Sequence, residues 1–132
     1  MKTYVPGTVC AILLGLASLA QAGQLVSPPL PTHPFRTNTT NEGVCRIRNT
    51  GTAPVTVTVS LFSNNGTAHL FDNCQGDGGP RTLAGGESCV VLKSLPDDSF
   101  VACKVTAPNV TNLRGTLEVD HNYNTNVAVD LR

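Results

Sequence analysis

The chain has 132 residues, and its nine Lys and Arg balance nine Asp and Glu to a formal net charge of zero. This length predicts a single domain. The balanced charge argues against binding to nucleic acid or to an anionic membrane, because both favour a basic surface. Tryptophan is absent and aromatic residues make up only 5%, so we expect a core of aliphatic side chains and cystine.

The first 22 residues have the order of a secretory signal peptide. Lys2 is followed by an apolar run over residues 9–19, and the segment ends in the small residues Ala20-Gln21-Ala22. This order predicts cleavage after Ala22 and export to the periplasm or the medium. The apolar run is shorter than the roughly 20 residues that span a bilayer, so we expect no membrane anchor. Cys10 would leave with the leader.

Residues 23–42 form a Pro-rich, extended entry segment that contains "SPPLPTHPF". Its backbone could pair with a neighbouring chain, but proline has no N–H to donate to a strand ladder. Residues 43–132 are expected to form the folded domain.

The domain reads as short strands separated by turns. In "PVTVTVSLF", residues 54–62, valines alternate with threonines, which is the two-residue period of a half-buried strand. The same rhythm returns in "CVVL", "FVACKV", "LRGTLEV" and "VAVDL", while Gly, Asn and Pro gather between these segments. No stretch has a sustained helical period. The pattern predicts an all-β, antiparallel sandwich of about seven strands.

Four cysteines remain after the leader is removed. An even number in an exported chain predicts two disulfides, for which three pairings can be written. We favour Cys45–Cys103, which joins the apolar faces of two strands, together with Cys74–Cys89, which closes a Gly-rich loop. Zinc would require closely spaced cysteine pairs, and neither the cysteines nor the histidines, His33, His69 and His121, have such spacing.

Two turn motifs resemble a known family. "NTGTAPVTVTV" and "TLAGGESCVV", with a cysteine between them, are similar to choice-of-anchor D domains of exported bacterial proteins and, more distantly, to ASH-type domains; both are immunoglobulin-like. The matching residues are Asn49, Gly51, Pro54, Cys74, Leu83, Gly86, Ser88 and Cys89, within residues 44–92. Gly85 stands where the family has proline. The resemblance implies an immunoglobulin-like sandwich, supports the Cys74–Cys89 pair and brings no catalytic residue.

Acidic residues in turns are candidate sites. Asp72, Asp77 and Glu87 could supply oxygen ligands to calcium, but their spacing does not fit an EF-hand. Asp97 and Asp98 are adjacent carboxylates in a proline-containing turn, where solvated side chains are expected to diverge. "GDGGP" lacks a serine nucleophile and is read as a flexible loop.

Three N-x-[ST] sequons begin at Asn38, Asn65 and Asn109. The leader and the family resemblance both point to a bacterial protein, so we read these sequons as chance matches in turns.

These observations favour an exported, non-enzymatic structural or protein-binding module without catalytic residues, metal or cofactor. An edge strand or loop would recruit a protein partner by strand addition or surface contact. The alternative is a small secreted hydrolase or metal-dependent enzyme, in which His69, Asp72, Asp77, Asp97 and Asp98 would converge.

Overall fold

The computed structural model describes residues 22–32, 41–64, 68–74, 80–96, 99–121 and 124–132. These residues form ten β-strands: β1 (Gly23–Val26), β2 (Leu30–Pro31), β3 (Asn41–Asn49), β4 (Val55–Ser63), β5 (Ala68–Asp72), β6 (Arg81–Leu83), β7 (Ser88–Leu95), β8 (Phe100–Ala107), β9 (Leu113–His121) and β10 (Asn124–Asp130).

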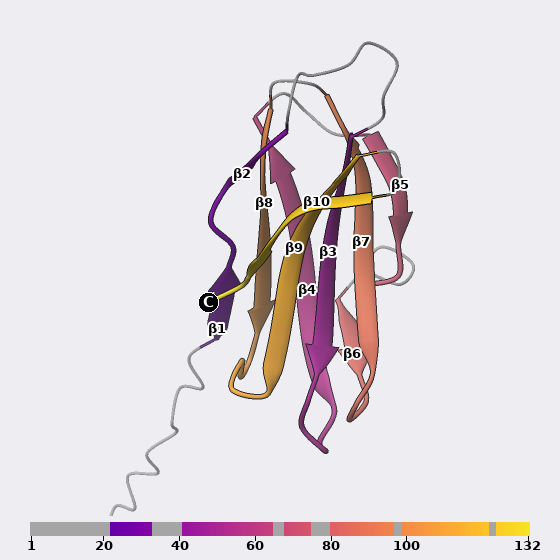
Figure 1. Cartoon of the computed structure of the whole chain (residues 1–132). Coiled ribbons are helices and arrows are strands. Elements are labelled where there is room, and N and C mark those ends of the chain that lie inside the picture. Colours follow the sequence, from indigo (N-terminus) through magenta and orange to yellow (C-terminus); the bar gives the residue numbers. More distant parts are fainter. Residues whose placement is uncertain (1–21, 33–40, 65–67, 75–79, 97–98, 122–123) are drawn as a thin grey trace, which may run out of the picture.

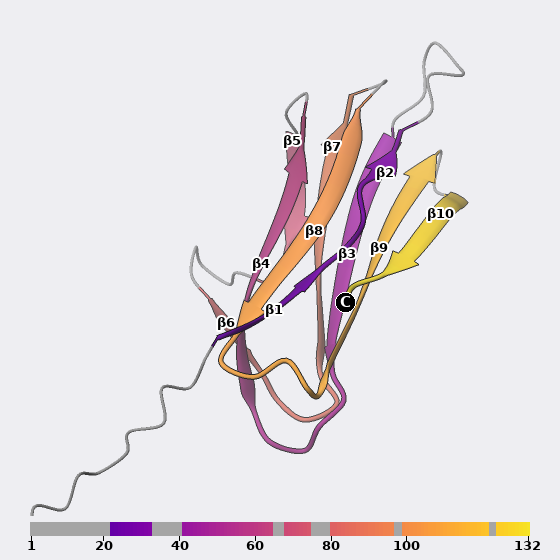
Figure 2. The same ribbon diagram turned by 90° about the vertical axis from the view of Figure 1, so that its left-hand side faces the viewer.

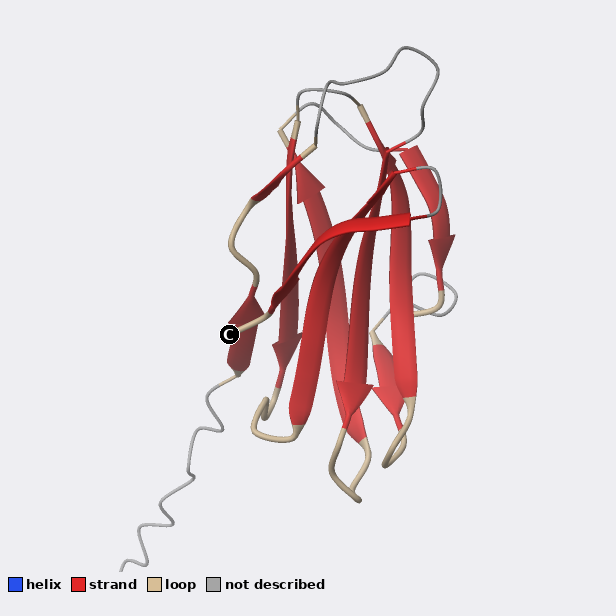
Figure 3. Ribbon diagram, in the orientation of Figure 1, coloured by secondary structure: helices blue, strands red, loops and turns tan. Residues whose placement is uncertain are grey.

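The strands form two antiparallel sheets packed face to face, which confirms the predicted sandwich (Figures 1 and 3). The first sheet has the order β1-β8-β4-β6, with β2 also paired to β8, and the second has the order β10-β9-β3-β7-β5. Figure 2 shows the sandwich from the side, with β4, β6 and β8 of the first sheet on the left and β3, β9 and β10 of the second sheet on the right. Since β1, β2 and β6 have four residues or fewer, the longer strands account for the predicted number.

The alternation in β4 sets which side chains enter the core. Val57 and Val59 are fully buried and Leu61 nearly so, whereas Thr56 and Thr58 are exposed. This arrangement confirms that the valine series faces inward. The inward series of β3, β7, β8 and β9 complete one aliphatic core between the sheets, whose burial is the main source of stability in a fold of this size.

Both predicted disulfides are present. Cys45 on β3 is bonded to Cys103 on β8, with a Cα–Cα distance of 6.1 Å, so this bond joins the two sheets through the core. Cys74, just after β5, is bonded to Cys89 on β7 at 5.0 Å. Two disulfides indicate an oxidising environment outside the cytoplasm.

Much of the entry segment belongs to the sandwich. Gly23–Val26 pairs with β8 of its own chain, and Asn41 and Glu42 already pair as part of β3. The backbones of Val26 and Arg132 exchange two hydrogen bonds, of 2.9 and 3.2 Å. Figure 1 shows the C-terminal end reaching β1, so β10 and the entry segment close one side of the sandwich.

The two turn motifs meet at a buried asparagine. The amide nitrogen of Asn49 donates to the carbonyl oxygens of Ala53, Leu83 and Ala84 at 2.8, 3.1 and 3.2 Å, and its Oδ1 accepts from the backbone N–H of Gly51 at 3.0 Å. Its side chain therefore ties the turn after β3 to the turn after β6. In that second turn Gly86 has φ of 80°, a conformation that favours glycine.

Candidate functional site

Among the described residues, the outer face of the second sheet carries charges of both signs. Because Cys45 and Ile47 of β3 enter the core, Val44, Arg46 and Arg48 face outward with Glu42. The outward residues of the neighbouring strand β9 are Arg114, Thr116, Glu118 and Asp120, and those of β7 are Ser88, Val90 and Leu92. We call this surface the outer face of the second sheet.

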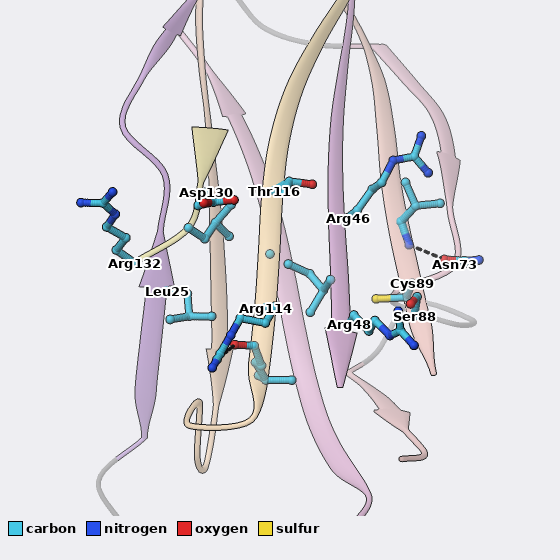
Figure 4. A pocket seen from close by; sticks show the side chains of 15 residues that line it. Leu25, Arg46, Arg48, Asn73, Ser88, Cys89, Arg114, Thr116, Asp130 and Arg132 are labelled. Atoms are coloured by element: carbon cyan, nitrogen blue, oxygen red, sulfur yellow. Dashed lines mark hydrogen bonds between the residues drawn. The ribbon is translucent and has the colours of Figure 1, made fainter. Parts of the chain in front are cut away.

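One end of this face is basic. Arg48 on β3 lies directly opposite Arg114 on β9, and Arg46 is two residues further along β3. The three arginines line an open groove of about 700 Å³, which Asp130 and Arg132 at the C-terminal end of the chain also line. Figure 4 shows Arg48 beside Ser88 on one side of β3, while Arg114 reaches away to the other side. The guanidinium groups therefore spread along the groove and do not converge on one point, an arrangement suited to an extended anionic surface.

Local contacts set the position of two of these arginines. Arg114 Nη1 donates to the carbonyl oxygens of Leu113 and Thr111 at 2.7 and 3.0 Å. Arg46 Nε lies 3.4 Å from Glu118 Oε2, with side chains 56% and 19% exposed, so this ion pair contributes only modestly to stability. Among the described residues, Arg48 has no acidic partner.

The opposite end of the face is acidic. Glu42 on β3 lies directly opposite Asp120 on β9. Both residues are partly exposed, yet Asp120 Oδ1 is buried and no hydrogen-bond partner reaches it in the described structure. Like charges directly opposite each other on neighbouring strands are unfavourable, so both ends of the face carry an electrostatic cost within the isolated chain.

Apolar side chains lie between the two charged ends. Val44 is only 1% exposed although it lies outside the core between the sheets. Its cross-strand neighbour Leu92 is partly exposed, and Phe71, which pairs with Leu92 from β5, is 51% exposed. An exposed aromatic ring beside aliphatic side chains and charged ends is typical of a protein-binding surface.

The outer face of the first sheet also carries exposed apolar side chains. Phe62 on β4 and Phe100 on β8 are 53% and 55% exposed. Phe62 pairs with Ala102, two residues from Phe100, so the two rings are diagonal neighbours. On the same face Lys104 lies opposite Ser60 and pairs with Val26, which is 43% exposed. This surface lacks the separated charges of the second sheet.

The carboxylates that the enzyme hypothesis would bring together are placed differently or lie outside the described residues. Asp72 Oδ1 accepts the backbone N–H of Cys74 at 2.7 Å, the contact of a turn-forming aspartate. Asp77, Asp97 and Asp98, with His33, lie outside the described residues. His69 belongs to β5 and His121 ends β9. In the part of the chain that is described, no three His, Cys, Asp or Glu gather as metal ligands.

Glu87, the third candidate calcium ligand, makes its contacts within its own turn. Its carboxylate accepts the backbone N–H of Ala84 at 2.8 Å and pairs with Arg81, which also donates to the carbonyl oxygen of Asn73. The hydrogen bond from Ala84, followed by that from Arg81, lowers the pKa of Glu87 below its usual value. This carboxylate is thus committed to holding the turn before β7.

Comparison with known proteins gives no relative: no family model, curated protein or solved structure matches this chain. The resemblance to choice-of-anchor D domains therefore stays a prediction. Among the described residues no helix is long and apolar enough to cross a membrane.

Sequence reasoning missed the charged face. The signal was present in "VCRIRN", where arginines alternate with core residues and must share the opposite face. What the sequence does not show is that Arg114, more than sixty residues later, lies beside Arg48.

Proposed function

We propose that this protein is an exported, non-enzymatic module that binds another protein through the outer face of the second sheet. Export rests on the leader pattern, with cleavage after Ala22 and release to the periplasm or the medium. Of this leader, residues 1–21 lie outside the described residues. The two disulfides support the same destination, because such bonds persist in oxidising compartments.

The observation that carries this proposal is the combination of an exposed aromatic ring and charges of both signs on one face. Phe71 is half exposed beside Leu92, and charges of opposite sign lie at the two ends of the same strands. Aromatic and arginine side chains are enriched where proteins bind each other. Separated charges add orientation, because only a partner with the complementary order of charges fits.

A photo-crosslinking experiment in the producing host tests the proposal. A photoreactive phenylalanine analogue is placed at Thr116, on the outer face of the second sheet, and in a matched variant at Thr58, on the outer face of the first sheet. We expect a protein-sized adduct at position 116 and none at 58. An adduct at 58 alone, or at neither position, would contradict the assignment of binding to this face.

A further inference from the structure

The groove at the basic end of the second sheet concentrates the positive charge of the chain. The whole chain has nine Lys and Arg, and four arginines line this one groove: Arg46, Arg48, Arg114 and Arg132. Among the described residues, Asp130 is the only acidic residue that lines it. The groove is therefore cationic although the formal net charge of the chain is zero.

The path of β10 leaves this groove open. Figures 1 and 2 show β10 crossing in front of β9 and β3 at the acidic end of the face, from where the chain continues to β1. Val44, between the two charged ends, is only 1% exposed, so β3 offers little surface there. At the basic end all four arginines are exposed, and this is where a ligand can reach the sheet.

The groove holds more hydrogen-bond donors than acceptors. Arg46 lies 3.4 Å from Glu118, and Arg114 donates through Nη1 to two backbone carbonyl oxygens of its own turn. Arg48 has no acidic partner in the described part of the chain. An arginine side chain has five N–H donors, so Arg46 and Arg114 also keep donors for a second acceptor. Such a surplus of charged donors favours an anionic ligand.

The arginines diverge across the strands. Arg48 and Arg114 lie directly opposite each other on β3 and β9, and Figure 4 shows their side chains pointing to opposite sides. Diverging side chains favour an extended ligand over a compact anion such as inorganic phosphate, which converging donors hold best. In an extended peptide, side chains two residues apart lie on the same side at roughly 7 Å, a spacing that suits two guanidinium groups pointing away from neighbouring strands.

We propose that this groove binds an extended acidic segment of the partner protein, with carboxylates at alternate positions of the segment. This inference rests on the proposed function, since it names the chemistry of the partner. The groove crosses the strands, from Asn73 and Ser88 beside β7 to Leu25 and Arg132 (Figure 4). Crossing from β7 over β3 and β9 to β10 covers about 14 Å, which four or five extended residues span.

Apolar side chains next to the groove favour a peptide over an acidic polysaccharide. Val90 on β7 lines the groove. Leu92 lies two residues further along β7, and it pairs with Phe71, which is 51% exposed. A peptide can place an apolar side chain against this surface beside its carboxylates, whereas a polysaccharide of uronic acids has none to offer. Arginine and aromatic side chains together are typical of sites that bind protein.

Two synthetic peptides test the charge of the ligand on the full disulfide-bonded protein. In one short, fluorescein-labelled peptide, glutamates alternate with threonines on both sides of a central phenylalanine; in the other, every glutamate is replaced by glutamine. By fluorescence anisotropy we expect the glutamate peptide to bind at least about tenfold more tightly, with the difference shrinking as salt is raised. Equal affinities, or no binding of either peptide, would overturn the inference. Tighter binding of an oligogalacturonate of the same charge would also overturn it.

Two variants that each remove one positive charge test the place of binding. Arg48→Gln should weaken binding of the glutamate peptide by about tenfold, because it removes charge-assisted hydrogen bonds. Lys104→Gln is the matched control, since Lys104 lies on β8 in the first sheet, and it should leave binding unchanged. The unfolding midpoint of Arg48→Gln should equal that of the wild type, which separates a lost contact from a damaged fold. Equal weakening by both variants would show attraction to the whole chain and would refute a site in the groove.

Photo-crosslinking separates this inference from the proposed function. Thr116 lines the groove, so the partner peptide attached at position 116 can be identified by mass spectrometry after digestion. We expect acidic residues at alternate positions in that peptide and a weaker adduct in Arg48→Gln. If the attached peptide is not acidic, the groove inference fails while protein binding by this face stands. If position 116 gives no adduct, both fail.

Discussion

Removing the side-chain amide of Asn49 should cost a large share of the stability of this domain. Asn49 is fully buried and makes four side-chain hydrogen bonds, three of them to the carbonyl oxygens of Ala53, Leu83 and Ala84. Its two N–H groups can satisfy about two of these carbonyls strongly at once, and Oδ1 accepts a third bond. At about 1 kcal/mol per bond, Asn49→Ala should lower the free energy of unfolding by about 3 kcal/mol.

Asn49→Asp provides a test of the same contacts by pH. The aspartate has nearly the same shape, but its ionised carboxylate would face three carbonyl oxygens, so its pKa in the folded protein is expected to rise. A group with a raised pKa in the folded state contributes stability that is present below the unfolded pKa of about 3.9 and is lost as pH rises from there through the folded pKa. Asn49→Asp should therefore be far less stable at neutral pH than at low pH, relative to the wild type.

Urea unfolding at fixed pH, without reducing agent, measures both effects. Thr50→Ala is the matched control, because the exposed hydroxyl of Thr50 makes a single hydrogen bond, to the carbonyl oxygen of Asn112. We expect this control to change the free energy of unfolding by less than about 1 kcal/mol. If Asn49→Ala costs no more than Thr50→Ala, Asn49 does not hold the two turns together.

Three further predictions follow from the core, the disulfides and the turn before β7. Val57→Asp should abolish secretion of folded protein because it buries a charge at a fully buried site, whereas exposed Thr58→Asp should be secreted at the wild-type level. Replacing both cysteines of the Cys45–Cys103 bond by alanine should lower the free energy of unfolding by about 4 kcal/mol, and the same change at Cys74–Cys89 should lower it by about 3 kcal/mol. The difference is expected because the sequence separations are 58 and 15. Equal losses in urea unfolding would argue against the loop-closure explanation. Because the pKa of Glu87 is lowered in the folded protein, its carboxylate stabilises the fold above its unfolded pKa of about 4.3, and this contribution is lost as pH falls through the folded pKa. When stability is followed during acid titration, Glu87→Gln should therefore lose stability less steeply than the wild type. Identical curves for the two proteins would count against the Arg81 and Ala84 contacts.

The sequence by itself determined the features that depend on neighbouring residues. The Val and Thr alternation of β4 placed Val57 inside and Thr58 outside, because successive side chains of a strand point to opposite faces. Both disulfides followed from the even number of cysteines behind a leader that predicts export, the apolar strand faces and the loops that each bond would close. The positions of the turns followed from Gly, Asn and Pro.

Tertiary structure decided which distant residues became neighbours. Strand alternation is local, whereas strand pairing joins segments far apart in the chain, and no local pattern specifies the pairing. The sequence predicted neither the pairing of Gly23–Val26 with β8 nor the meeting of two turns at Asn49. For the same reason, Arg48 and Arg114 read as unrelated surface charges until β3 and β9 pair. The candidate site exists only because that pairing gathers charges of one sign at each end of a sheet.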